Sequence, residues 1–80
     1  MKIKVLTFGV TRDIIGEDVL FLDLPAGSTV ADVRTHLTER FPPIEKLASL
    51  MFAVNAEYAT SEAQLAELDE LALIPPVSGG

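Results

Sequence analysis

The chain ends in six residues whose types favour chemistry at the terminal carboxylate: Pro75, Pro76, Val77, Ser78, Gly79 and Gly80. Proline lacks a backbone donor and glycine has no side chain, so residues 75–80 are expected to project as a flexible, extended tail. A Gly-Gly end can pass through a narrow channel of another protein and present the Gly80 carboxylate there. That carboxylate can attack ATP to form an acyl-adenylate, which a sulfur donor or another nucleophile then displaces. Gly-Gly by itself is equally compatible with a frayed terminus that has no function.

The side chains outside this tail offer no convincing active site. The chain has no cysteine, which excludes disulfides, thiolate metal sites and cysteine nucleophiles. His36 is the only histidine and is interpreted as a partly exposed helix residue, because no second histidine or cysteine accompanies it. Glu67, Asp69 and Glu70 are interpreted as a solvated acidic cluster, since acid–base catalysis would need an enclosing pocket. The five glycines lack the spacing of a phosphate-binding loop, so neither ATP nor another cofactor is expected to bind to this chain alone.

Length and charge narrow the class of protein. Eighty residues predict a single domain over residues 1–80, with a small core. The net charge of -6 argues against nucleic acid and anionic membranes as partners, and suits either a basic protein partner or simple solubility. Neither a signal peptide nor an apolar run long enough to cross a membrane is found, so the cytoplasm is the expected compartment.

The elements that must position the tail begin with a predicted sheet. Residues 2–8 and 17–24 alternate in hydrophobicity and are rich in β-formers, which predicts two strands in a hairpin. Residues 52–54 and 71–74 are predicted as two further strands, the first of them turning at residues 55–57. The last strand therefore leads directly into the tail.

One main helix is predicted to cover this sheet. Thr29 followed by Asp32 resembles a capping box and predicts the helix start, and the proline pair at 42 and 43 ends the helix. Residues 10–15 fit a loop or a single helical turn, and residues 44–51 are predicted as a second, short helix. Apolar residues at helical spacing form the expected buried stripe: Val30, Val33, Leu37 and Phe41. The fold class is predicted as α+β, with one helix packed across a mixed sheet.

The strand pattern also predicts an exposed apolar patch at the base of the tail. If Leu71 and Leu73 point toward the helix, Ala72 and Ile74 face outward, and the first strand presents Leu6 and Phe8 beside them. Such a patch is typical of a partner surface, unless a loop covers it. Arg12 is a weaker candidate for contacts near the tail; pairing with Asp13 in solvent is the alternative.

Several motifs together resemble the small, sulfur-carrier subunit of molybdopterin synthase, nearly from end to end of the chain. They are residues 3–8 (IKVLTF), Arg12-Asp13 with Gly16, Thr29-Val30, Ala53-Val54-Asn55, residues 68–72 (LDELA) and the ending PPVSGG at residues 75–80. A bare Gly-Gly is shared with ubiquitin-like modifiers and the thiamine-pathway carrier, whereas the PPVSGG ending is more particular to the molybdopterin subunit. The resemblance implies a ubiquitin-like β-grasp fold.

The same resemblance implies a mechanism centred on the chain end. Gly80, preceded by Gly79, would be adenylated with ATP by a separate ubiquitin-activating-like adenylyltransferase and converted to a thiocarboxylate. The large synthase subunit, expected in a heterotetramer with this chain, would take up the tail and transfer the sulfur to a pterin precursor. Its own side chains would be the catalytic ones, which leaves open whether this chain counts as an enzyme. Partner contacts are predicted at Leu6, Phe8, Arg12, Ile74, Pro75, Pro76, Val77 and Ser78.

Two alternatives remain open at this point. One is a carrier or modifier with the same activation chemistry but another acceptor, in thiamine synthesis, tungsten-cofactor synthesis or protein conjugation. The other is a β-grasp interaction module whose tail is inert.

Overall fold

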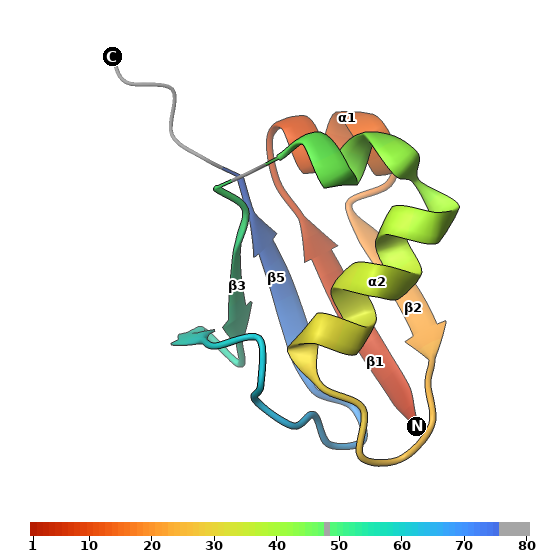
Figure 1. The fold of residues 1–80 in the computed structure, drawn as a ribbon, viewed down its shortest axis with the longest axis vertical. Helices are drawn as coiled ribbons and strands as arrows, with labels where there is room; N and C mark the ends of the chain where they lie inside the picture. The colour runs from red at the N-terminus through yellow and green to blue at the C-terminus, as the bar shows by residue number, and fades with distance from the viewer. Residues whose placement is uncertain (48, 76–80) are drawn as a thin grey trace.

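The computed structural model describes residues 1–47 and 49–75, which form a mixed five-stranded sheet with one long helix across it (Figure 1). The strands lie in the order β2-β1-β5-β3-β4. β1 and β5 run parallel at the centre, and the other neighbours are antiparallel. The α+β class and the mixed sheet are therefore confirmed. The strands are β1 Lys2–Thr7, β2 Val19–Asp23, β3 Met51–Val54, β4 Glu57–Ala59 and β5 Glu70–Ile74.

Helix α2 (Val30–Arg40) begins at the predicted capping box. The backbone N–H of Asp32 donates to Thr29 Oγ1 at 3.3 Å, and the backbone N–H of Thr29 donates to Asp32 Oδ2 at 2.8 Å. These two bonds satisfy donors that a helix start otherwise leaves free, and the Asp32 carboxylate lies at the positive end of the helix dipole. The cap thus fixes where α2 starts above the sheet.

Thr29→Ala is expected to lower the free energy of unfolding by about 1 kcal/mol, because it removes the oxygen that caps α2. Thr35→Ala, at an exposed position within α2, is the matched control and should leave stability unchanged or slightly raised, because alanine favours a helix more than threonine does. Urea denaturation followed by circular dichroism measures both variants. Equal stability of the two variants would show that the cap contributes nothing.

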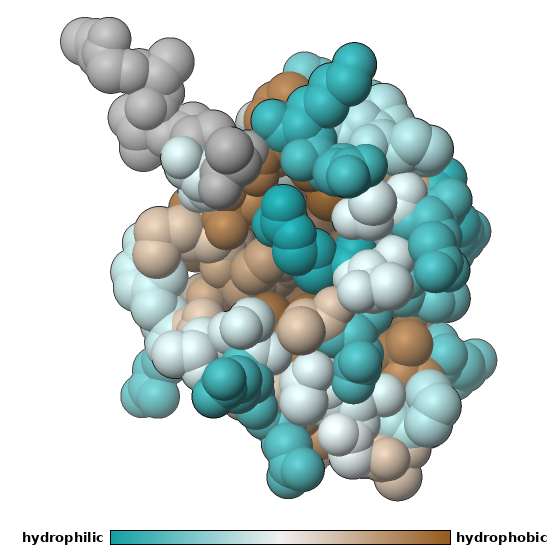
Figure 2. All heavy atoms as spheres, viewed as in Figure 1, coloured by the Kyte–Doolittle hydropathy of each residue, from teal (hydrophilic) through white to brown (hydrophobic). Residues whose placement is uncertain are grey.

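The core lies between α2 and the sheet, where the predicted alternation places it. Ile3 and Val5 of β1 and Leu71 and Leu73 of β5 are fully buried. Val30, Val33 and Leu37 of the predicted helix stripe are buried against them, whereas Phe41 is only partly buried and lies one residue beyond α2. Figure 2 shows this side of the molecule, with polar side chains over α2 and hydrophobic ones gathered beside it over β3 and β5.

Two short helical elements differ from the prediction. Residues 10–15, expected as a loop or a single helical turn, form the longer helix α1 (Val10–Ile15), which ends at Gly16 with φ of 85°. The predicted helix over 44–51 is wrong: a 3-10 helix, η1 (Pro42–Lys46), takes its place, and Met51 already belongs to β3. No helix within residues 1–47 and 49–75 is long and apolar enough to span a membrane.

Strand β4 was absent from the prediction. It pairs with β3 through a tight turn at Asn55 and Ala56, both with positive φ. The predicted turn at residues 55–57 is therefore one residue too long, since Glu57 is the first residue of β4. The hairpin extends the sheet beyond β3, and its turn at Ala56 adds a wall to the apolar surface on the face opposite α2.

Candidate functional site

The face of the sheet opposite α2 carries an apolar row that crosses all five strands. Each residue of the row is paired in register with the next, so their side chains share one face. The row runs Val19, Leu6, Ala72, Ala53 and Tyr58, in the order of the strands. Both ends of the row are open to solvent, because Val19 is 37% and Tyr58 69% exposed.

The centre of this face is hollowed into an apolar cavity of about 440 Å³. Its lining residues are Leu6, Phe8, Ala53, Ala56, Glu70, Ala72 and Ile74, here called the sheet hollow. Four of them, Leu6, Phe8, Ala72 and Ile74, are the residues that the strand pattern placed outward together. Phe8 is 49% exposed, so no loop within the described residues covers it. The geometry thus joins the predicted residues in one place; their role in binding a partner stays a prediction.

Three lining residues were not predicted to belong to the patch. Ala53 is predicted in a strand and in a family motif but not in the patch, and its register opposite Ala72 puts it in the row. Ala56 belongs to the predicted turn after the third strand, which the sequence did not connect with the patch. Glu70 was assigned to a solvated acidic cluster, yet it forms the rim of the hollow and lies 3.8 Å from Lys4 Nζ. The alternation of β5 alone would have placed Glu70 on the same face as Ala72.

β5 ends at Ile74, a lining residue of the sheet hollow, and Pro75 follows it. Pro75 lies next to Gly9, in the turn after β1. A Cβ on Gly9 would lie 3.4 Å from Pro75 Cγ, so a side chain at this position would press against Pro75. The fully buried Thr11 anchors this turn, since its Oγ1 donates to the Phe8 carbonyl at 2.7 Å and accepts from the Phe8 N–H at 2.9 Å. The rest of the predicted site lies outside the described residues: Pro76, Val77, Ser78, Gly79 and Gly80.

Arg12 pairs differently from the alternative that the sequence left open. Its Nε lies 2.8 Å from Asp18 Oδ1, across the turn that follows α1. Asp13 is the next residue on the same helix, and consecutive helix positions do not face each other. The ion pair is largely exposed, with 63% and 69% of the two side chains accessible, so it contributes little to stability.

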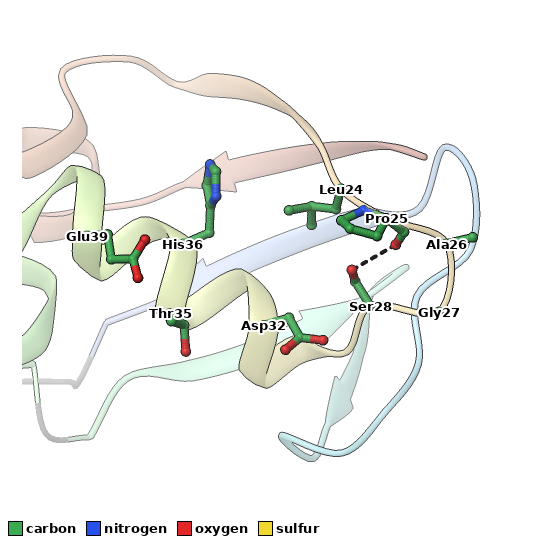
Figure 3. Close-up of a pocket in the computed structure, with 9 residues that line it drawn as sticks. All are labelled: Leu24, Pro25, Ala26, Gly27, Ser28, Asp32, Thr35, His36 and Glu39. Atoms are coloured by element: carbon green, nitrogen blue, oxygen red, sulfur yellow. Dashed lines mark hydrogen bonds between the residues drawn. The ribbon is translucent and has the colours of Figure 1, made fainter.

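A second cavity, also of about 440 Å³, lies between α2 and the turn that precedes it (Figure 3). Two of its polar side chains have structural partners. Asp32 belongs to the helix cap, and Ser28 Oγ donates to the Pro25 carbonyl at 2.7 Å. His36 lines this cavity, and residues 1–47 and 49–75 contain no group of three His, Asp or Glu side chains arranged to hold a metal. Ser28 and Asp32 therefore serve the turn and the start of α2, and they are not arranged as a binding site.

Known proteins resemble this chain in both sequence and fold. A family model described as the ThiS family matches residues 5–80. The molybdopterin synthase sulfur carrier subunit of Arabidopsis thaliana is 42% identical over 81 residues, which cover 100% of this chain and 84% of that protein.

Two solved structures of known proteins have a fold similar to that of this chain. SAMP1 from Haloferax volcanii has a TM-score of 0.88 at 27% identity, covering 100% of both chains. A chain in the complex of subunits 1 and 2 of the molybdopterin-converting factor from Helicobacter pylori has a TM-score of 0.71 at 27% identity, again covering 100% of both chains. The chain therefore belongs to the ThiS family and has its ubiquitin-like β-grasp fold, and within that family it belongs with the sulfur carrier subunits of molybdopterin synthase.

Proposed function

We propose that this chain carries sulfur for molybdopterin synthesis as a thiocarboxylate on Gly80. One observation carries the proposal: the strand that leads to the Gly-Gly end, β5, forms part of an open apolar hollow with its last residue, Ile74. A carrier needs a docking surface next to its reactive end and needs no enclosed active site of its own. The sheet hollow meets the first requirement.

The proposed chemistry takes place at one carbon atom. A Gly80 carboxylate oxygen attacks the α-phosphorus of ATP, pyrophosphate leaves, and an acyl-adenylate forms. A sulfur nucleophile at the oxidation level of sulfide then adds to the acyl carbon and AMP leaves, so one oxygen is exchanged for sulfur. ATP is bound by the activating adenylyltransferase, and the described side chains of the carrier are needed only for docking.

We further propose that the large synthase subunit docks on the sheet hollow while it receives the chain end. The similarity to a chain in the Helicobacter pylori complex of subunits 1 and 2 supports such a partner. The acidic rim at Glu70 and the net charge of -6 favour a partner surface with basic groups around an apolar centre. A heterotetramer of two carriers and two large subunits is the proposed assembly, and the catalytic side chains are assigned to the large subunit.

A second candidate shares the activation step and differs in the acceptor. The similarity to SAMP1, named a small archaeal modifier protein, favours attachment of Gly80 to an amine of another protein. The two functions have different products. Sulfur transfer regenerates a free carboxylate on Gly80, whereas conjugation leaves Gly80 in an isopeptide bond.

Mass spectrometry with fragmentation tests the proposal after incubation with the cognate activating enzyme, ATP and a sulfur source. The expected result is an ATP-dependent exchange of oxygen for sulfur located at Gly80. Localisation is essential because oxidation of a methionine changes the nominal mass equally, and Met51 is 51% exposed. An unmodified Gly80 in the presence of a demonstrably active enzyme would refute the carrier function and leave an interaction module.

A further inference from the structure

The turn between β3 and β4 is strained, because both of its residues have positive φ. Only one of the two, Asn55, is of a type that commonly adopts this conformation. Asn55 has φ of 50° and Ala56 φ of 70°. A two-residue hairpin turn of this kind is typically Asn-Gly, because glycine alone adopts positive φ without a steric penalty. A side chain with a Cβ in this region is disfavoured by contact with the backbone carbonyl.

Asn55 has a clear structural reason to be there. Asparagine tolerates positive φ, and its amide group makes two hydrogen bonds: Nδ2 donates to Asp69 Oδ1 at 3.0 Å and Oδ1 accepts from the Glu70 N–H at 3.0 Å. The backbone N–H of Asn55 also donates to the Glu70 carbonyl at 2.8 Å. The hairpin turn is thereby tied to the start of β5.

Ala56 has no polar side chain to make such bonds. What distinguishes it is its position, since it is a lining residue of the sheet hollow together with Ala53 and Ala72. Strained residues persist where the surrounding structure holds them and are concentrated at binding sites. Replacing the methyl group by hydrogen would relieve the strain and remove part of the apolar wall at the same time.

We propose that the methyl group of Ala56 is a contact for the large subunit, and that the strained backbone holds it in the wall of the sheet hollow. This inference rests on the proposed function and adds a specificity-determining residue to it. The occupant is an apolar side chain of the large subunit, seated on the Ala53, Ala56 and Ala72 methyl groups, with a basic group opposite Glu70. The apolar lining and the carboxylate at its rim select that chemistry.

The chain contains a matched control for the strain. Leu68 has φ of 68°, nearly the same as Ala56, but its side chain is 69% exposed and does not line the hollow. Its backbone N–H donates to the Lys2 carbonyl at 2.8 Å, which either residue type preserves. Leu68→Gly therefore releases a comparable strain at a place where no docking is proposed.

The test compares Ala56→Gly, Leu68→Gly and the wild-type chain for binding to the purified large subunit by calorimetry, with melting temperatures measured in parallel. Both variants are expected to melt no lower than the wild type. Ala56→Gly should bind about fourfold more weakly, the change expected for one methyl group that is no longer buried, and Leu68→Gly should bind as the wild type does. In sulfur transfer, Ala56→Gly should raise KM with kcat unchanged.

Each other outcome overturns the inference. Wild-type affinity of Ala56→Gly would show that the methyl group makes no contact. Equal weakening by both variants would assign the effect to strain release. A wild-type chain that fails to bind the large subunit would refute the proposed docking itself, whereas wild-type binding with an unaffected Ala56→Gly refutes only the role of the methyl group.

Discussion

Adding one residue after Gly80 is expected to abolish sulfur transfer and to leave the fold unchanged. The extension moves the terminal carboxylate about 3.5 Å along the chain, and a misplacement of about 1 Å in an active site already costs about a hundredfold in rate. Changing Gly79 to a bulky residue should have the same effect, because a Cβ and larger side chain cannot pass where glycine passes. The last strand ends at Ile74, so both changes lie outside the strands of the sheet.

The measurement is the rate of dithiolene formation in a reconstituted system, with circular dichroism and melting temperature as evidence of folding. Amidation of Gly80 is the matched control, since it keeps the length of the chain and removes only the carboxylate. All three variants should be inactive and equally stable. Normal turnover with the extended chain would refute the mechanism at the chain end.

Local signals predicted the parts of this fold that short segments determine. The capping box needs only Thr29 and Asp32, three residues apart, and both of its bonds are present. The alternation of β1 and β5 likewise placed Ile3, Val5, Leu71 and Leu73 inward. Four of the seven lining residues of the sheet hollow followed from that alternation, because outward residues are fixed once inward ones are known.

The missed elements lacked such local signals. β4 has three residues, and the turn before it carries alanine where glycine would mark a tight hairpin. The helix predicted over 44–51 relied on apolar residues that serve different elements: Ile44 is fully buried in η1, whereas Met51 begins β3. Pro42 and Pro43, read as a helix end, also start η1, since proline suits a first helical turn.

The strand order and the partner of Arg12 depend on distant residues. Placing β5 between β1 and β3 requires pairings such as Val5 with Leu71, which no short window of sequence contains. Arg12 reaches Asp18 only because α1 ends at Gly16 and the chain turns back toward β2. The composition of the hollow was therefore predictable from β1 and β5, and its wall at β3 and the turn was not.

Phe8→Asp should weaken binding of the large subunit by about thirtyfold or more, the loss typical of a central interface residue that costs about 2 kcal/mol or more. Its charge would lie in the apolar hollow, where docking would strip it of water. Phe8 is 49% exposed in the free carrier, so the variant should still fold. Ile74→Asp should have the same effect on affinity. Because Ile74 belongs to β5, this substitution can also lower the stability of the sheet.

Phe21→Asp is the matched control for Phe8→Asp. Phe21 is 57% exposed and lies on the same face of the sheet, opposite Lys4, but it does not line the hollow. Its substitution should leave the affinity unchanged in the same titration. Equal losses for the two phenylalanines would mean that the whole face docks, and unchanged affinity of Phe8→Asp would remove the hollow from the interface.

Sulfur transfer by thiocarboxylated Phe8→Asp distinguishes docking from chemistry. This variant keeps an intact Gly80, so a high concentration of the large subunit should restore its transfer rate, because the loss lies in binding. The chain extended beyond Gly80 should stay inactive at every concentration, because no thiocarboxylate stands at the position of reaction. If excess large subunit fails to rescue Phe8→Asp, the hollow must also position the chain end, and docking and chemistry are then not separable in this carrier.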